Sequence, residues 1–75
     1  MTNADIIRQV VAQELCIPDE EVLPGRTFVE MGADSMDLRA LILSFEEELG
    51  VEIPDDDAEK LRTPQAVLEY IEGQK

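Results

Sequence analysis

The chain has 75 residues, of which 44% are apolar, and its 18 acidic and 6 basic side chains give a formal net charge of −12. A chain of this length forms one small domain and cannot enclose a deep catalytic cleft, so we expect a single domain over residues 1–75. The negative field repels phosphate backbones and anionic lipid headgroups, which makes nucleic acids and membranes poor partners. It favours proteins with basic docking surfaces.

The cysteine content and the first residues bear on the cellular compartment. Cys16 is the single cysteine and follows an apolar stretch, so we expect a buried structural thiol and no internal disulfide. The first residues show neither a basic segment nor a continuous apolar run, as a signal peptide would. We therefore expect a soluble cytoplasmic protein. Separately, we expect the chain to be a monomer.

The first predicted element is an amphipathic helix from Thr2 to Leu15. Its apolar residues recur at steps of three and four residues, which places them on one face of a helix. Thr2 and Asp5 have the spacing of a capping box, in which each side chain accepts a main-chain N–H of the other residue.

A long ordered loop is predicted over residues 18–32, because prolines and glycines interrupt this stretch and its apolar residues are scattered. Loops of this length in compact domains are usually functional or closely packed. Phe28 and Val29 are the expected anchors that hold the loop against the helices.

Three further helices are predicted after the loop. The second helix begins at Asp34, a good N-cap, and ends before Gly50, which suits a left-handed C-terminal position. A short third helix follows Pro54 and ends near residue 61, and the last helix spans residues 64–72. The sequence thus predicts an all-α fold, a small four-helix bundle of three longer helices and one short helix.

The second and last helices should each present an apolar stripe to the core. On the second helix, the residues that share this face are Leu38, Leu41, Ile42, Phe45 and Leu49. On the last helix, they are Ala66, Val67, Tyr70 and Ile71.

The opposite face of the second helix carries an apolar strip among acidic residues. Met36, Ala40 and Leu43 fall on this side together with Glu47. A Met and a Leu left outward in this way suggest a contact surface for another protein, although single exposed apolar residues are common.

Ser35 lies in the first turn of the second helix. There the main-chain amides and the helix dipole would stabilise a negative group attached to its hydroxyl. An isolated Asp34-Ser35 pair is, however, more typical of a plain helix cap. A serine hydrolase is disfavoured, because the chain has no histidine to act as a base and no Gly-x-Ser-x-Gly turn.

A calcium loop is also disfavoured. Asp55, Asp57 and Glu59 stand at alternate positions, as in the EF-hand, but Lys60 occupies the position where that loop requires glycine. We expect no dedicated metal site.

The sequence around Ser35 resembles a known signature. Residues 32–37, Gly-Ala-Asp-Ser-Met-Asp, are similar to the attachment motif of the acyl carrier protein family, and the resemblance continues through residues 28–30, 45–49 and 52–61. It implies that Ser35 receives 4′-phosphopantetheine from coenzyme A through a separate phosphopantetheinyl transferase that uses Mg²⁺. The thiol of this arm would then carry acyl groups as thioesters between enzymes, and the chain itself would not be an enzyme.

The resemblance also implies roles for other residues. Asp34 belongs to the motif that flanks the attachment site. The residues expected to contact partner enzymes are Met36, Asp37, Arg39, Ala40, Leu43, Glu46 and Glu47. The residues expected to line an acyl pocket, from their apolar positions beside the second helix, are Phe45, Ile53, Leu61 and Val67.

The sequence departs from the family pattern at two places, near Met31 and at Arg39-Ala40. Met31 stands alone where many relatives have two residues, and we expect it to fill a core position. Arg39-Ala40 replaces an apolar residue followed by glutamate on the outward face. Because such charges govern encounter and partner choice, we expect a specialised carrier for a dedicated pathway of fatty acid or related acyl-chain synthesis.

Two alternatives remain open. Polyketide carriers and aminoacyl or peptidyl carriers share the modified serine and differ in cargo. An acidic protein-interaction domain would leave Ser35 unmodified, as a cap residue.

Overall fold

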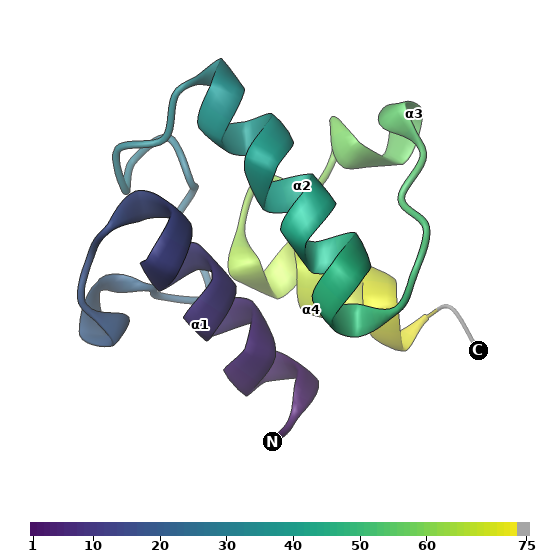
Figure 1. Ribbon diagram of the computed structural model, residues 1–75, viewed down its shortest axis with the longest axis horizontal. Helices are drawn as coiled ribbons and strands as arrows, with labels where there is room; N and C mark the ends of the chain where they lie inside the picture. The colour runs from purple at the N-terminus through teal and green to yellow at the C-terminus, as the bar shows by residue number, and fades with distance from the viewer. Residues whose placement is uncertain (74–75) are drawn as a thin grey trace.

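The computed structural model describes residues 1–73, which fold into four α-helices and one 3₁₀ turn. The elements are α1 (Asn3–Leu15), η1 (Asp19–Glu21), α2 (Ser35–Leu49), α3 (Asp55–Ala58) and α4 (Pro64–Glu72). In Figure 1, α3 lies to one side of α2, and the long connection between α1 and α2 lies on the other side. The predicted all-α bundle of three longer helices and one short helix is confirmed.

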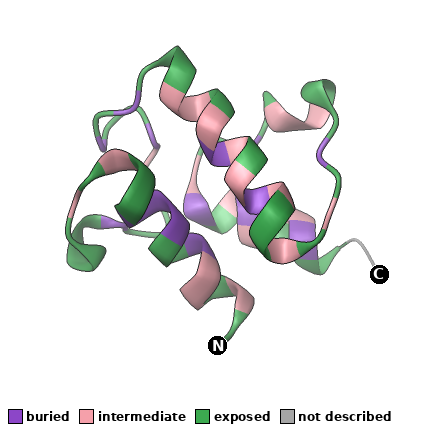
Figure 2. Ribbon diagram, in the orientation of Figure 1, coloured by how far each residue is buried: buried purple, intermediate pink, exposed green. Residues whose placement is uncertain are grey.

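The core lies where α1, α2 and α4 meet, as the buried positions in Figure 2 show. The largest side chains in it are fully buried: Phe28, Phe45, Ile7, Leu41, Val11 and Val67. α1 packs against both α2 and α4. Within residues 1–73, none of the helices combines the length and the apolar character needed to cross a membrane.

The predicted capping box at the start of α1 is present. The main-chain N–H of Asp5 donates to Oγ1 of Thr2 over 3.2 Å, and the N–H of Thr2 donates to Oδ2 of Asp5 over 3.3 Å. Hydrogen bonding of the Asp5 carboxylate by the main chain and then the side chain of Thr2 stabilises its ionised form, which lowers the pKa of Asp5 below its usual value. Arg8 contributes further through its ion pair with Asp5 at 2.8 Å.

The prediction of a buried thiol at Cys16 is wrong, because this side chain is exposed. Cys16 follows the last residue of α1 and adopts a left-handed conformation with φ 55°. Its N–H donates to the carbonyl of Ala12, and the chain turns away from the helix axis at this point. The turn removes Cys16 from the apolar stripe, and the next residue, Ile17, packs against the core instead.

Only one of the two predicted loop anchors is correct. Phe28 is 1% exposed and its ring packs against that of Phe45 with the centroids 6.1 Å apart, whereas Val29 is 64% exposed. The main chain explains the difference: the N–H of Phe28 donates to the carbonyl of Arg62 over 2.9 Å, which fixes the Phe28 side chain inward. A tight turn follows immediately, so Val29 points outward.

Main-chain contacts join the loop to the opposite end of the chain. Besides the bond from Phe28 to Arg62, the N–H of Gln65 donates to the carbonyl of Pro24 over 3.0 Å. Within the loop, the Glu30 carboxylate accepts from the N–H and the hydroxyl of Thr27 over 2.9 and 3.0 Å. These two hydrogen bonds lower the pKa of Glu30.

The third helix is shorter than predicted. It ends at Ala58 and not near residue 61, because the following N–H groups of Lys60 and Leu61 donate three residues back, to Asp57 and Ala58, in tight turns.

The last helix begins as predicted and its apolar stripe is only partly confirmed. Oγ1 of Thr63 accepts from the N–H of Ala66 over 3.0 Å, which caps α4. Val67 and Ile71 are buried, whereas Ala66 and Tyr70 are only half-buried. The Tyr70 hydroxyl donates to Oδ2 of Asp57 over 2.8 Å.

Candidate functional site

Ser35 is the first residue of α2 and is exposed. The cap of this helix is made by its neighbours: the N–H of Asp37 donates to Oδ1 of Asp34 over 2.8 Å, and the N–H of Asp34 donates to Oδ2 of Asp37 over 3.2 Å. Because this capping box is complete without Ser35, the serine hydroxyl is not needed to start the helix. It is accessible to a modifying enzyme.

The chain segment before Ser35 is held firmly. Met31 and Ala33 are buried, as expected for Met31, and the N–H of Ala33 donates to the carbonyl of Phe28 over 3.0 Å. Gly32 lies between them with φ 104°, a conformation that residues with a Cβ rarely adopt. The two buried side chains and the glycine turn thus fix the point at which α2 begins.

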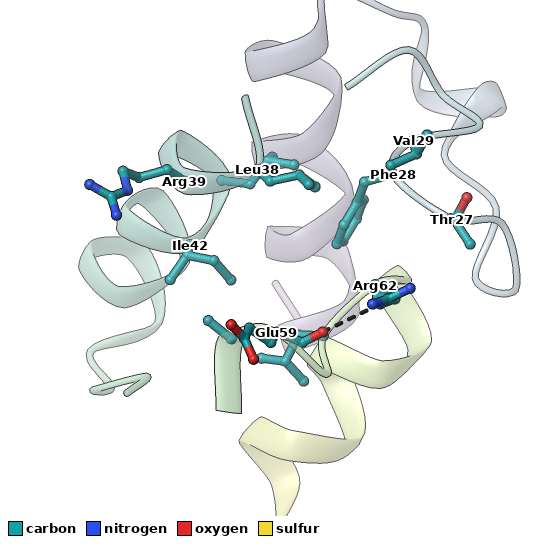
Figure 3. Close-up of a pocket in the computed structure, with 11 residues that line it drawn as sticks. Thr27, Phe28, Val29, Leu38, Arg39, Ile42, Glu59 and Arg62 are labelled. Carbon is teal, nitrogen blue, oxygen red and sulfur yellow. Dashed lines mark hydrogen bonds between the residues drawn. The ribbon is translucent and has the colours of Figure 1, made fainter. Parts of the chain in front are cut away.

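A cavity of about 830 Å³ lies beside α2. It is bounded by the loop at residues 27–29, by α2, and by α3 with the turn that follows it. Its apolar wall is formed by Phe28, Leu38, Leu41, Ile42, Ala58 and Leu61, and the exposed Val29 also borders it. In Figure 3, Leu38 and Phe28 approach the cavity from opposite sides, and Ile42 lies one turn along the helix from Leu38.

Polar groups stand at the edge of this cavity. Arg39 and Arg62 are both among its lining residues, and Nε of Arg62 donates to the carbonyl of Glu59 over 3.3 Å. Figure 3 shows the Arg39 side chain directed away from Leu38, so that its stem borders the cavity while its guanidinium points outward. An apolar interior with a charged edge suits a ligand that has an apolar body and a polar attachment.

The four predicted acyl-pocket residues do not lie together on this wall. Leu61 lines the cavity, whereas Phe45, Ile53 and Val67 are buried in the core and do not line it. Phe45 lies behind the wall, against the ring of Phe28.

Sequence reasoning missed most of the wall. Leu38, Leu41 and Ile42 were expected to face the core, and only Leu41 is fully buried. Helical periodicity identified their common face but could not distinguish a cavity from a packed core. Phe28 was expected to anchor the loop and does so, and its second role as a cavity wall had no signal in the sequence.

The apolar strip on the outer face of α2 is present. Met36 is 80% exposed and Leu43 is 56% exposed, and Glu47 is exposed as well. Ala40 lies between them and is half-buried. The strip begins beside Ser35 and runs along α2.

The other residues expected to contact partners have different surroundings. Asp37 is engaged in the capping box, and Oε2 of Glu46 accepts from the N–H of Ile53 over 2.9 Å. The Glu46 carboxylate therefore holds the connection from α2 to α3. Arg39 is exposed at the edge of the cavity.

These features fit a covalently attached phosphopantetheine. Attachment of this group requires an exposed hydroxyl and surroundings that tolerate a negatively charged phosphodiester on that hydroxyl. Its cargo requires an apolar space nearby. Ser35 supplies the hydroxyl at the start of a helix of 15 residues, where the dipole favours an anion, and the cavity borders the same helix.

Comparison with known proteins agrees with this geometry. The family model described as "Phosphopantetheine attachment site" matches residues 5–71. The chain is similar to the acyl carrier protein of Thermosynechococcus vestitus (strain NIES-2133 / IAM M-273 / BP-1), with 48% identity over 66 residues that cover 87% of this chain and 82% of that protein. The chain therefore belongs to the acyl carrier protein family, whose members are carriers with a covalently attached 4′-phosphopantetheine.

Proposed function

We propose that Ser35 is the attachment site and that the chain delivers acyl thioesters to the enzymes of a fatty acid or related acyl-chain pathway. The observation that carries this proposal is the exposed Ser35 hydroxyl, which the capping box of α2 does not use and which lies on the same helix as the apolar cavity. When attached, 4′-phosphopantetheine supplies a thiol that forms the thioester.

The role of Ser35 is that of a nucleophile under the control of another protein. In the transfer, Oγ of Ser35 loses its proton and forms a phosphodiester bond, and adenosine 3′,5′-bisphosphate leaves from coenzyme A. The phosphopantetheinyl transferase and its Mg²⁺ would catalyse this step. The chain contributes an accessible hydroxyl and the positive end of the α2 dipole, which stabilises the phosphodiester.

The cavity would shelter the acyl chain from water. Its volume of about 830 Å³ falls within the range of small-molecule sites. Each methylene of a cargo that enters it should contribute about 0.8 kcal/mol. In this proposal Leu61 lies on the wall, and Phe45, Ile53 and Val67 form the packed core that supports the cavity.

The outer face of α2 would meet the partner enzymes. Met36 and Leu43 offer apolar contacts, and exposed acidic residues such as Glu47 complement a basic surface. The net charge of −12 accelerates encounter with such surfaces and suits brief, exchangeable contacts. That the protein is a cytoplasmic monomer stays a prediction.

The attachment can be tested by the intact mass of the protein before and after incubation with coenzyme A, Mg²⁺ and a permissive phosphopantetheinyl transferase. Ser44 provides a matched control, because it is the only other serine and its hydroxyl is engaged with Glu14 at 2.9 Å. The wild type and Ser44→Ala should each gain one phosphopantetheine, and Ser35→Ala should gain none. No gain by a folded, previously unmodified wild type would make the interaction-domain reading the leading one.

The pathway is a separate question. Arg39 and Ala40 depart from the family pattern on the outward side of α2, which favours a dedicated acyl-chain pathway over the general fatty acid synthase. The double substitution Arg39→Val and Ala40→Glu should therefore improve turnover by fatty acid synthase enzymes. Unchanged kinetics would contradict a specialised role, and loading of the wild type by an aminoacyl or polyketide enzyme would favour the alternative carriers.

A further inference from the structure

Arg39 follows Ser35 by four residues on α2, and this spacing makes the two side chains neighbours. Residues four apart on a helix have their Cβ atoms about 5–6 Å from each other. Helical side chains also lean toward the N-terminus of the helix. From this position the long, exposed side chain of Arg39 can reach the space beside the serine oxygen, where an attached group would lie.

Two carboxylates near Ser35 oppose the favourable effect of the α2 dipole on a phosphodiester. The carboxylates of Asp34 and Asp37 flank the serine in the capping box, and the net charge of the chain is −12. A further negative charge at this point is repelled by both carboxylates. A cation within reach would offset that repulsion.

Arg39 is available for this role. Its side chain is exposed, and the one ion pair found within residues 1–73 joins Arg8 to Asp5 instead. None of the side-chain hydrogen bonds identified in the same residues comes from the Arg39 guanidinium, whereas Arg62 on the other side of the cavity donates to Glu59. A guanidinium also binds phosphate oxygens through two parallel N–H groups, which an ammonium cannot do.

We infer that Arg39 is a positioning residue that pairs with the phosphodiester on Ser35 and holds the base of the arm at the cavity. Because the stem of Arg39 borders the cavity (Figure 3), the same side chain that binds the phosphodiester also forms part of the entrance. This inference rests on the proposed attachment at Ser35. It assigns to Arg39 a role toward the arm, beside its expected role toward partner enzymes.

The test compares the melting temperatures of the unmodified and the phosphopantetheine-bearing protein, at low salt, in four variants. These are the wild type, Arg39→Gln, Arg39→Lys and Arg8→Gln, the last of which changes the net charge equally on a different helix. The quantity compared is the Tm of the modified form minus the Tm of the unmodified form. Because Arg39→Gln removes an ion pair that exists only in the modified form, this difference should be lower by about 1–4 °C in Arg39→Gln than in the wild type. Arg39→Lys should keep part of the difference, and Arg8→Gln should keep all of it.

Two further readouts separate an ion pair from a structural effect. The effect of Arg39→Gln should disappear in 1 M NaCl, where the Debye length falls to about 3 Å. In ¹⁵N NMR spectra, the Nε–Hε signal of Arg39 should move when the wild type is modified. An unmoved signal, an unchanged Tm difference in Arg39→Gln, or an equal loss in Arg8→Gln would each overturn the inference. A wild type that gains no mass would contradict the attachment itself, which distinguishes the two failures.

Discussion

Substitution of Phe28 should weaken the fold far more than substitution of the neighbouring Val29. Phe28 is 1% exposed, packs against Phe45 and borders the cavity, so Phe28→Ala should cost about 3–5 kcal/mol. For a chain of 75 residues the whole free energy of unfolding is about 4–11 kcal/mol, and this variant is therefore close to unfolding. Phe28→Leu keeps most of the apolar volume and should cost about 1–2 kcal/mol, through the lost ring pair and a small void.

Urea unfolding followed by circular dichroism measures this loss. With a slope of about 1 kcal/mol per molar urea for a domain of this size, the midpoint of Phe28→Leu should fall by about 1–2 M. Val29→Ala is the matched control, because Val29 is 64% exposed and its truncation should change stability by no more than about 0.5 kcal/mol. Equal losses at the two positions would refute the argument that the main-chain bond to Arg62 selects which residue of the pair faces inward.

Three further predictions concern caps and carboxylates. Both Cys16 and Gly50 have positive φ, which strains a residue that carries a Cβ, so Cys16→Gly should stabilise the protein by about 1 kcal/mol and Gly50→Ala should destabilise it by a similar amount. A Cβ at Gly50 meets no other atom, so the cost of Gly50→Ala comes from the backbone alone. Urea midpoints that move in the other directions would contradict this. The lowered pKa of Glu30 means that its ionised form stabilises the fold above the usual value of 4.5, and that this contribution is lost as the pH falls through the lower folded value. The Tm difference between wild type and Glu30→Gln should therefore be constant near neutral pH and shrink below pH 4.5, and a difference that grows on acidification would show the opposite sign. Glu46→Ala should cost about 1 kcal/mol, because the partly buried main-chain N–H of Ile53 loses its acceptor, while Glu47→Ala should have little effect. Equal urea midpoints for the two variants would argue against a structural role for Glu46.

The starts of the three longer helices could be predicted because caps are local chemistry. Thr2, Asp34 and Thr63 each accept a hydrogen bond from an N–H three residues later, and the spacing of these residues is visible in the sequence. The same locality explains the correct start of α2 and hence the position of Ser35. Gly50 was predictable for a similar reason, because glycine suits a left-handed residue at a helix end.

The errors come from contacts between residues far apart in the chain. Which of Phe28 and Val29 faces inward depends on a hydrogen bond to Arg62, which no local pattern reveals. The wall of the cavity was not predicted for a related reason. Leu38 and Ile42 have the spacing of core residues, and the cavity beside them is bounded by α3 and the turn that follows it, whose position is a long-range feature. The early end of α3 at Ala58 was itself not predicted.

The two main-chain hydrogen bonds that join the long loop to the start of α4 also affect how this carrier can evolve. Phe28 donates to Arg62 and Gln65 donates to Pro24 through groups that are nearly independent of side-chain identity. The path of the loop is thus maintained when surface side chains such as Val29 or Arg62 are replaced. Mutations can therefore change the shape and charge of the cavity edge while Ser35 keeps its place at the start of α2.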